Sequence, residues 1–159
     1  MSTSFVGIPT MTDSDTGEKK IWYLNGQLHR EDGPAIECED GHKEWYIHGK
    51  CNREDGPAIE GAYGYNAWYL NGKRHREDGP ALETVGYKAW YIHGKLHRED
   101  GPAAEGEGKH WYLKGKRHRE DGPAIECTRS LNGNKWYLNN EQISEKEHSL
   151  QTTLVKRAI

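Results

Sequence analysis

The sequence is poor in the residues that fill an ordinary protein interior. Of its 159 residues, 33% are apolar and 30% are charged, and leucine, isoleucine and valine are scarce. Such a composition comes close to that of disordered chains, which bury too little apolar surface to fold. It excludes a large central core. Because no apolar run approaches the roughly 20 residues of a membrane-spanning helix, no membrane span is expected.

The sequence also lacks an excess of basic charge, and it has few cysteines. A formal net charge of −3 gives no positive field that would draw the chain onto nucleic acid, which is therefore not an expected partner. Cys38, Cys51 and Cys127 show no CxxC spacing, which indicates free thiols in a reducing compartment. The N-terminal residues lack the basic start and apolar core of a signal peptide. We expect a cytoplasmic protein.

Aromatic residues and a repeat are what the sequence has instead. It contains six tryptophans and nine tyrosines, and each such ring can bury about 150–250 Å². A sixteen-residue block, seen at Trp111–Glu126, occurs five times and is followed by an incomplete sixth copy. The copies begin 23, 23, 22, 21 and 25 residues apart, at Trp22, Trp45, Trp68, Trp90, Trp111 and Trp136. An array stabilised by contacts between neighbouring repeats fits this pattern.

Each block begins with the pattern of a β-hairpin. A Trp-Tyr-Leu or Trp-Tyr-Ile segment runs into a turn such as Asn25-Gly26, a strong signal for a two-residue type I′ turn. The implied register sets Tyr23 opposite Leu28, and alternation then sorts the side chains onto two sides. Trp22 and His29 fall on the side expected to be packed. Glu-Asp-Gly-Pro then makes a corner, where glycine permits unusual φ, and Ala-Ile-Glu supplies a short third strand.

The pattern predicts an all-β fold, an elongated single-layer antiparallel sheet of stacked β-hairpins with a short C-terminal capping helix. Residues 1–19 are predicted to be a flexible N-terminal segment, residues 20–140 the repeat array and residues 141–159 the cap. Repeat lengths vary only between the final Glu of one block and the next Trp, so these stretches are predicted to be loops. Ser144 and Glu147 form a capping-box pattern, which predicts a helix from about Glu145 to Arg157.

The period and the placement of the turns resemble the MORN repeat family. The residues that carry the resemblance are 68–73, Trp-Tyr-Leu-Asn-Gly-Lys, and the loop 86–87, with their equivalents over roughly residues 20–140. The resemblance implies consecutive β-hairpins stacked in one twisted sheet. The block WYxNGKxHREDGPAxE is closer to divergent MORN-like repeats of uncharacterised phage and large-DNA-virus proteins. That likeness implies a phage or viral protein in the host cytoplasm, and it supplies no activity.

A second resemblance concerns Trp-Tyr-Leu-Asn at intervals of about twenty residues. It is similar to the cell-wall-binding repeats of secreted bacterial and phage proteins, which hold choline or sugars between aromatic rings. The lack of a signal-peptide pattern and the charged corner common to all five blocks favour the MORN-like interpretation.

The charged and histidine side chains of the block favour structural roles over catalysis. Carboxylate pairs such as Glu31-Asp32 occur five times in equal surroundings, whereas acid–base catalysis needs one site that separates two pKa values. We therefore predict ion pairs between arginine and carboxylate, and no enzyme. Asn52 stands where other copies have histidine, which favours structural hydrogen bonding over metal binding. No catalytic residue, metal site or cofactor is predicted. The histidines concerned are His29, His75, His97 and His118.

Binding residues are predicted on two surfaces. The variable loops are the first, because identical repeats cannot distinguish partners; their candidates are Tyr63, Tyr65, Tyr87, His110 and Arg129. The second is a Tyr/Arg face, since both residue types are enriched at binding surfaces. Its candidates are Tyr23, Tyr46, Tyr69, Tyr91 and Tyr112 with Arg30, Arg53, Arg76, Arg98 and Arg119.

Two functional hypotheses follow. The first is a non-catalytic repeat module that binds a protein partner, such as a phage or viral inhibitor of a host protein. The alternative is a small-ligand binder or sponge that holds a nucleotide or a sugar of a glycan on the Tyr/Arg face. A sheet edge at the first repeat also favours self-association.

Overall fold

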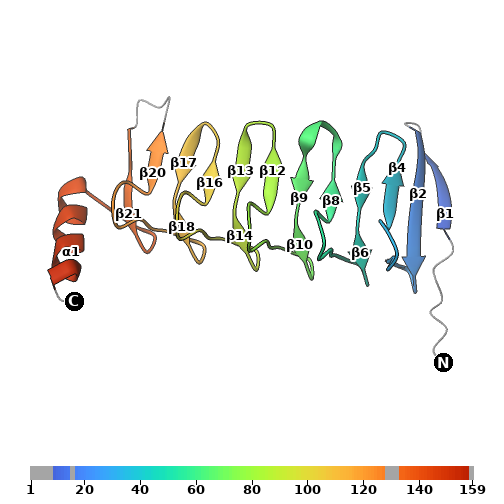
Figure 1. Ribbon diagram of the computed structural model, residues 1–159, viewed down its shortest axis with the longest axis horizontal. Helices are drawn as coiled ribbons and strands as arrows, with labels where there is room; N and C mark the ends of the chain where they lie inside the picture. Colours follow the sequence, from blue (N-terminus) through green and yellow to red (C-terminus); the bar gives the residue numbers. More distant parts are fainter. Residues whose placement is uncertain (1–8, 15–16, 128–132, 158–159) are drawn as a thin grey trace. The chain divides into compact units, whose positions relative to one another are not determined.

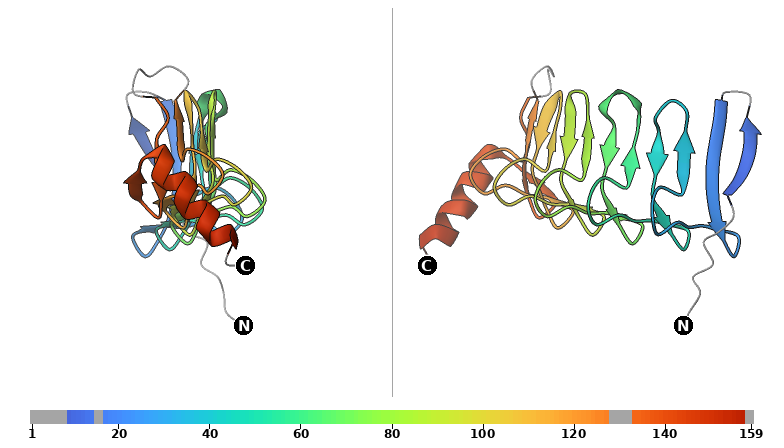
Figure 2. Two further views of the ribbon diagram at one scale, coloured as in Figure 1. Left: turned by 90° about the vertical axis from the view of Figure 1, so that its left-hand side faces the viewer. Right: turned by 45° about the vertical axis from the view of Figure 1, so that its right-hand side comes forward.

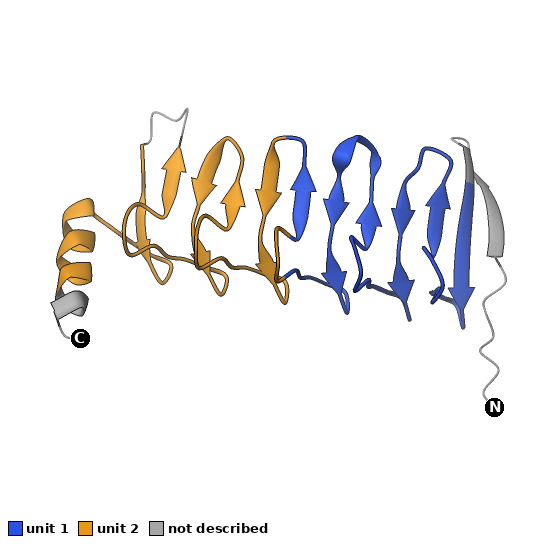
Figure 3. Cartoon of the chain, viewed as in Figure 1, with its two compact units in different colours: residues 1–76, 81–85 blue, residues 77–80, 86–159 orange. Residues whose placement is uncertain are grey.

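The computed structural model describes residues 9–14, 17–127 and 133–157, and the side chains of residues 19–127 and 133–153. The chain divides into two compact units, residues 1–76 with 81–85 and residues 77–80 with 86–159 (Figure 3). Antiparallel β-hairpins recur along both units, and one α-helix ends the second. The predicted all-β class, with its hairpin repeats and short C-terminal helix, is confirmed.

The first unit contains a seven-strand antiparallel path whose neighbours are joined by backbone hydrogen bonds (Figure 1). Its first hairpin lies largely in the segment predicted to be flexible: residues 9–14 form a strand that pairs with residues 17–22. The strands follow in the order β1 (Pro9–Ser14), β2 (Gly17–Leu24), β4 (Ile36–Cys38), β5 (Lys43–Glu44), β8 (Ile59–Glu60), β9 (Asn66–Ala67) and β12 (Leu82–Thr84).

The second unit continues the same alternation. Its strands follow in the order β13 (Tyr87–Ala89), β16 (Ala104–Glu105), β17 (Gly108–His110) and β20 (Ile125–Cys127). Neighbours pair antiparallel. The third strand that Ala-Ile-Glu predicts is present in every complete block, as β4, β8, β12, β16 and β20.

A two-residue hairpin precedes each corner, with the predicted register. Tyr23 pairs with Leu28, and the same pairing recurs in later copies. Both central residues of each turn have positive φ, as in Asn25 (51°) and Gly26 (75°), so the predicted type I′ geometry is confirmed. The remaining hairpin strands are β3 (Gln27–Leu28), β6 (Tyr46–Ile47), β7 (Lys50–Cys51), β10 (Tyr69–Leu70), β11 (Lys73–Arg74), β14 (Tyr91–Ile92), β15 (Lys95–Leu96), β18 (Tyr112–Leu113), β19 (Lys116–Arg117), β21 (Trp136–Leu138) and β22 (Glu141–Ile143).

The stretches between blocks are only partly loops, which corrects the sequence-based prediction. The residues before Trp45, Trp68, Trp90 and Trp111 form β5, β9, β13 and β17 of the main sheets. A polar segment of two or three residues is too short to show the apolar–polar alternation that marks a strand in sequence. Its backbone N–H and C=O groups nevertheless pair with the neighbouring strand. In the four stretches that the structure describes in full, the hairpin tips remain as loops, and one of them contains the 3₁₀ turn η1 (Ala62–Gly64).

Each complete block closes on itself, and alanine forms its interior. The Trp22 N–H donates to the carbonyl of Ala35, thirteen residues later, at 2.9 Å, and the four later blocks repeat this bond. The alanine of each Gly-Pro-Ala is fully buried, whereas most tryptophans are half-buried. Trp22 and His29 are buried as expected, whereas the tryptophans of the later blocks are half-buried, so the alanine is the side chain that is fully buried in every complete block. These alanines are Ala35, Ala58, Ala81, Ala103 and Ala124.

The C-terminal helix α1 (Glu145–Arg157) has the predicted bounds and packs on β21 (Figure 2). Its N-terminus has the predicted capping box. The Glu147 N–H donates to Ser144 Oγ at 3.2 Å, and the Ser144 N–H donates to Glu147 Oε2 at 2.8 Å. Among the described residues, no helix has the length and apolar character needed to cross a membrane.

Candidate interaction surfaces

The arginine of each Arg-Glu-Asp-Gly corner is held by residues of its own repeat. The guanidinium of Arg30 lies over the Trp22 ring, 4.1 Å from its centroid. Its Nε donates to Asp32 at 2.9 Å, and its Nη1 donates to the Pro34 carbonyl at 3.2 Å and to Glu37 at 3.3 Å. The corners of Arg53, Arg98 and Arg119 repeat these bonds, and the Arg76 guanidinium lies likewise over Trp68 at 4.1 Å. The predicted ion pairs between arginine and carboxylate are thus present.

The corner glycine makes room for this guanidinium. A Cβ atom added to Gly33 would lie 2.9 Å from Arg30 Cζ, closer than side chains tolerate. Gly56, Gly101 and Gly122 meet their own arginines at 2.9–3.0 Å. None of these glycines has positive φ. The sequence-based explanation of unusual φ is therefore wrong at these corners, and the glycine is explained by the space that the arginine needs.

These contacts change the acidity of the groups that make them. Hydrogen bonding and charge attraction from arginine lower the pKa of Asp32, Asp55 and Asp100 below the ordinary value of 3.8. Burial lowers the pKa of Arg53, but its hydrogen bonds to Asp55 and Glu60 outweigh this and raise the pKa overall. These three aspartates are therefore ionised at neutral pH, and the positive charge of the arginine in the same corner partly balances the charge of each.

Histidine and asparagine connect neighbouring repeats. His29 Nδ1 accepts a hydrogen bond from the His48 N–H of the next hairpin turn at 3.1 Å, and Asn52 Oδ1 accepts from the Asn71 N–H at 2.7 Å. His97 and His118 make the same bond in the second unit. These residues act as acceptors for a backbone donor, which agrees with the structural role predicted from the exchange of histidine for asparagine.

The predicted Tyr/Arg face is not one surface. Its arginines Arg30, Arg53, Arg76, Arg98 and Arg119 lie over tryptophan rings and not over the predicted tyrosines. The tyrosine side has a different cation: Arg74 Nε donates to the Tyr69 hydroxyl at 3.1 Å, and Arg117 does the same to Tyr112.

The other tyrosines of the predicted face lie in varied surroundings. The Tyr46 hydroxyl donates to Glu44 at 2.7 Å, and burial together with this bond raises the pKa of Tyr46. Tyr23 is partly exposed, and Tyr91 is half-buried. A row of equal tyrosine sites for a stacked ligand is therefore not what the described residues form.

The loop candidates are spread over different elements. Tyr63 lies at a hairpin tip in η1, while Tyr87 lies in β13 and His110 in β17. Burial, followed by the charge of Arg117, lowers the pKa of His110. Tyr65 is half-buried beside Gly61. Arg129 lies outside the described residues.

Tyr63 differs from the other loop candidates in two respects. Its side chain is 94% exposed, and its backbone has φ 58° and ψ 31°, in the left-handed region. Gly64 follows with φ 77°, so the pair occupies the two central positions of a tight turn. Asparagine and glycine are the residues that such turns favour.

Sequence reasoning missed Val85, which is 87% exposed at the next tip of the same unit. It lies beside Gly64: a Cβ atom added there would lie 3.9 Å from Val85 Cγ2. The two tips are neighbours because β9 pairs with β12, with Asn66 opposite Glu83. Valine is a typical strand residue, so at the end of β12 it resembles part of the strand. Nothing in the sequence indicates that its side chain is exposed.

Among the residues that the structure describes, no group of three or more His, Cys, Asp or Glu side chains could hold a metal ion. The corner aspartates of the first, second, fourth and fifth repeats are each bonded to arginine. The three cysteines are free thiols, and burial raises the pKa of Cys51 to about 12.

Comparison of the chain with family models, with curated proteins and with solved structures finds no match.

Proposed function

We propose that this protein is a non-catalytic repeat module that binds a protein partner, and that Tyr63 and Val85 form the centre of the contact. The observation that carries the proposal is the state of Tyr63, which is almost fully exposed and held in a strained backbone conformation. A left-handed conformation costs a residue with a Cβ atom about 1–2 kcal/mol, and an exposed ring gains nothing from burial.

The nearly complete exposure of Tyr63 means that burial of its ring among the described residues offsets little of this cost. Asparagine at the same turn position, as in the Asn25 and Asn71 turns, would satisfy the backbone better. Strained residues concentrate at binding sites, and tyrosine is among the commonest residues at the centre of protein interfaces. Val85, beside Gly64 on the neighbouring hairpin tip, adds a second exposed apolar side chain.

The repeated blocks support the same proposal, because their constant side chains already have structural partners. Their tryptophans, arginines, histidines and aspartates are engaged in stacking, ion pairs and junction bonds, so the constant part of the repeat acts as scaffold. Specific recognition then falls to positions that differ between repeats. We place the protein in the cytoplasm, in keeping with its free thiols.

The test replaces Tyr63 with photoreactive p-benzoylphenylalanine, irradiates cells that contain the protein, and identifies the crosslinked polypeptide. The same replacement at Glu39, an exposed position at the preceding tip, is the control. The affinity of the purified partner is then measured for Tyr63→Asn and Tyr63→Phe. We expect Tyr63→Asn to weaken binding at least about tenfold while raising the melting temperature of the free protein, and Tyr63→Phe to change binding little. Equal affinity of Tyr63→Asn and wild type would refute the proposal.

A further inference from the structure

The last tryptophan lacks the partner that the others have. In each complete repeat the arginine eight residues after the tryptophan covers its ring, at 3.9–4.1 Å from the centroid. Eight residues after Trp136 stands Ser144, which caps α1 instead. Over the described part of the chain, no cationic side chain lies against the Trp136 ring.

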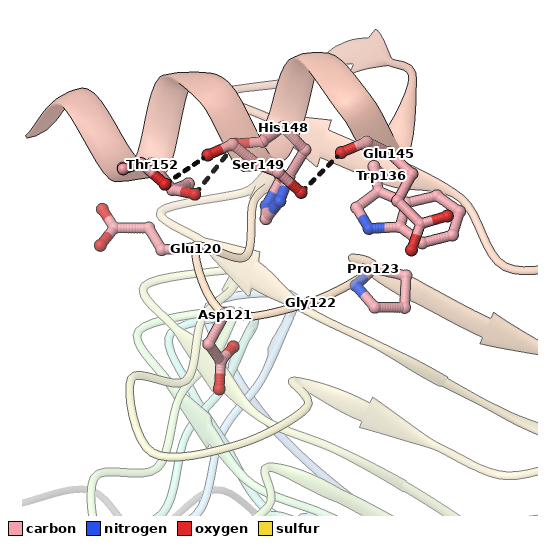
Figure 4. A pocket seen from close by; sticks show the side chains of 10 residues that line it. Glu120, Asp121, Gly122, Pro123, Trp136, Glu145, His148, Ser149 and Thr152 are labelled. Carbon is pink, nitrogen blue, oxygen red and sulfur yellow. Dashed lines mark hydrogen bonds between the residues drawn. The ribbon is translucent and has the colours of Figure 1, made fainter.

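A pocket of about 510 Å³ lies at this position, between the corner of the fifth repeat and α1 (Figure 4). Gly122 and Pro123 of the corner, the Trp136 ring, and Glu145 and His148 of the helix line it. A groove of about 710 Å³ around Trp111 is lined in the corresponding way, but two guanidinium groups, those of Arg98 and Arg119, belong to its walls. The last pocket thus has the aromatic wall of an interior groove without its cations.

The charge of the pocket is negative. The Glu145 carboxylate is exposed at its rim and makes no hydrogen bond or ion pair with any described residue. Glu120 lies at the opposite rim, with His118 at 3.6 Å. The N-terminus of α1 carries a partial positive charge, which Glu145 and Glu147 in the first turn offset.

We propose that this pocket binds the guanidinium group of an arginine side chain presented by the protein partner. The inference rests on the proposed function, because it takes the cation to come from that partner. The complete repeats provide the template: in each of them a guanidinium stacks on the indole face, and in the first, second, fourth and fifth its N–H groups donate to a carboxylate. Arginine fits better than lysine, because a planar guanidinium can stack and donate within its plane at once.

The test titrates the purified protein with N-acetyl-arginine amide and follows the indole N–H resonances by NMR, with Trp136→Phe to assign the peak. Probe concentrations on the order of 10–100 mM are needed, because one stacked cation binds weakly. N-acetyl-citrulline amide, which has nearly the same shape without the charge, and N-acetyl-lysine amide are the matched probes. Trp111, whose ring Arg119 already covers, is the internal control.

We expect saturable shifts of the Trp136 resonance with arginine, weaker shifts with lysine and none with citrulline. Glu145→Gln should weaken arginine binding severalfold, and Glu141→Gln, at an exposed position outside the pocket, should not. Equal shifts with citrulline, or equal shifts of Trp111 and Trp136, would overturn the inference.

The outcome is separate from that of the Tyr63 experiment, because the probe needs no partner. If the arginine probe does not bind but a partner is found whose binding depends on Tyr63, only the proposal for the Trp136 pocket is refuted. If the arginine probe binds saturably but no polypeptide is crosslinked at position 63, arginine binding by the pocket is supported and the partner contact at Tyr63 is refuted.

Discussion

The fifth and sixth repeats have the same hairpin and different endings. Lys114 and Asn139 begin their turns with φ 50° and 51°, and Tyr112 and Tyr137 pair with Arg117 and Gln142 in the same register. The fifth repeat then closes through the Trp111 N–H and the Ala124 carbonyl, with Arg119 over the ring. The sixth turns into a helix. The hairpin of the sixth repeat therefore forms from its own residues, without the corner that follows the hairpin in the complete repeats.

The helix replaces part of what a further repeat would provide. His148 is buried, and its Nε2 bonds to the carbonyl of Arg119 at 2.7 Å. Asn140, which takes the place of the turn glycine, accepts a hydrogen bond from the Arg117 N–H through its side chain. The cap therefore satisfies backbone groups at the end of the array, but no guanidinium of a described residue lies over the Trp136 ring.

The largest expected effect tests whether the corner depends on the space at its glycine. Gly122→Ala should lower the free energy of unfolding by about 2 kcal/mol, because the new methyl group would displace Arg119 from Trp111. Arg119→Ala removes that clash, so Gly122→Ala should cost close to nothing in the Arg119→Ala background. Urea unfolding of the four proteins measures this cycle. Additive effects would show that the arginine is not what the glycine accommodates.

The next effect concerns the junction between these two repeats. His118→Ala should cost about 1 kcal/mol, because the Asn139 N–H loses its acceptor, whereas His118→Asn should stay within about 0.5 kcal/mol of wild type. Asn52 already performs this task in the first unit. Thermal unfolding of both variants provides the comparison, and an asparagine variant as unstable as the alanine variant would contradict an acceptor role.

A third difference concerns acid. The pKa values of Asp32, Asp55 and Asp100 are lowered by arginine in the folded state, so the stability they contribute is complete above their unfolded value near 3.8 and is lost as pH falls through their folded values. The sixth repeat has Lys146 at this position and contributes nothing of this kind. Asp100→Asn should make stability, measured by urea unfolding, less dependent on pH below about 4. An unchanged pH dependence would contradict the cause given for the shift.

The smallest effect concerns the turns. Lys114→Asn should stabilise the protein by about 0.5–1 kcal/mol, because asparagine tolerates the left-handed conformation better, and Asn139→Lys should destabilise it by a similar amount. Melting temperatures of the two variants test this. Changes of equal sign would show that the two hairpins are not equivalent.

The sequence predicts the local parts of this fold better than the contacts between them. Asn25-Gly26 and its equivalents determine turn type and register because the signal lies within the turn, and Ser144 with Glu147 marks the helix start. The stacking of Arg30 on Trp22 depends on the path of the corner between them, where strand alternation no longer applies. The polar strand Lys43–Glu44 could not be predicted for a related reason: it is a strand because its backbone pairs with neighbouring strands, and its own sequence carries no strand pattern.

The candidate sites show the same limit. Tyr63 was found because it breaks the repeat, but its strained backbone is a property of the folded turn. Val85 resembles a strand residue in sequence, and its exposure depends on where the tip lies. The Trp136 pocket comes from a missing arginine, which becomes informative only once the interior repeats show what covers the other rings.

The hydrogen bond from the Trp N–H of each complete block to the alanine carbonyl thirteen residues later also determines how the chain should respond to force. Because each complete block is closed by its own bonds, stretching the molecule from its two ends should open the blocks one after another. Each event should release one period of about 23 residues, or roughly 75–80 Å of extended chain. A force–extension trace should therefore show evenly spaced steps, and their number would count the closed repeats directly.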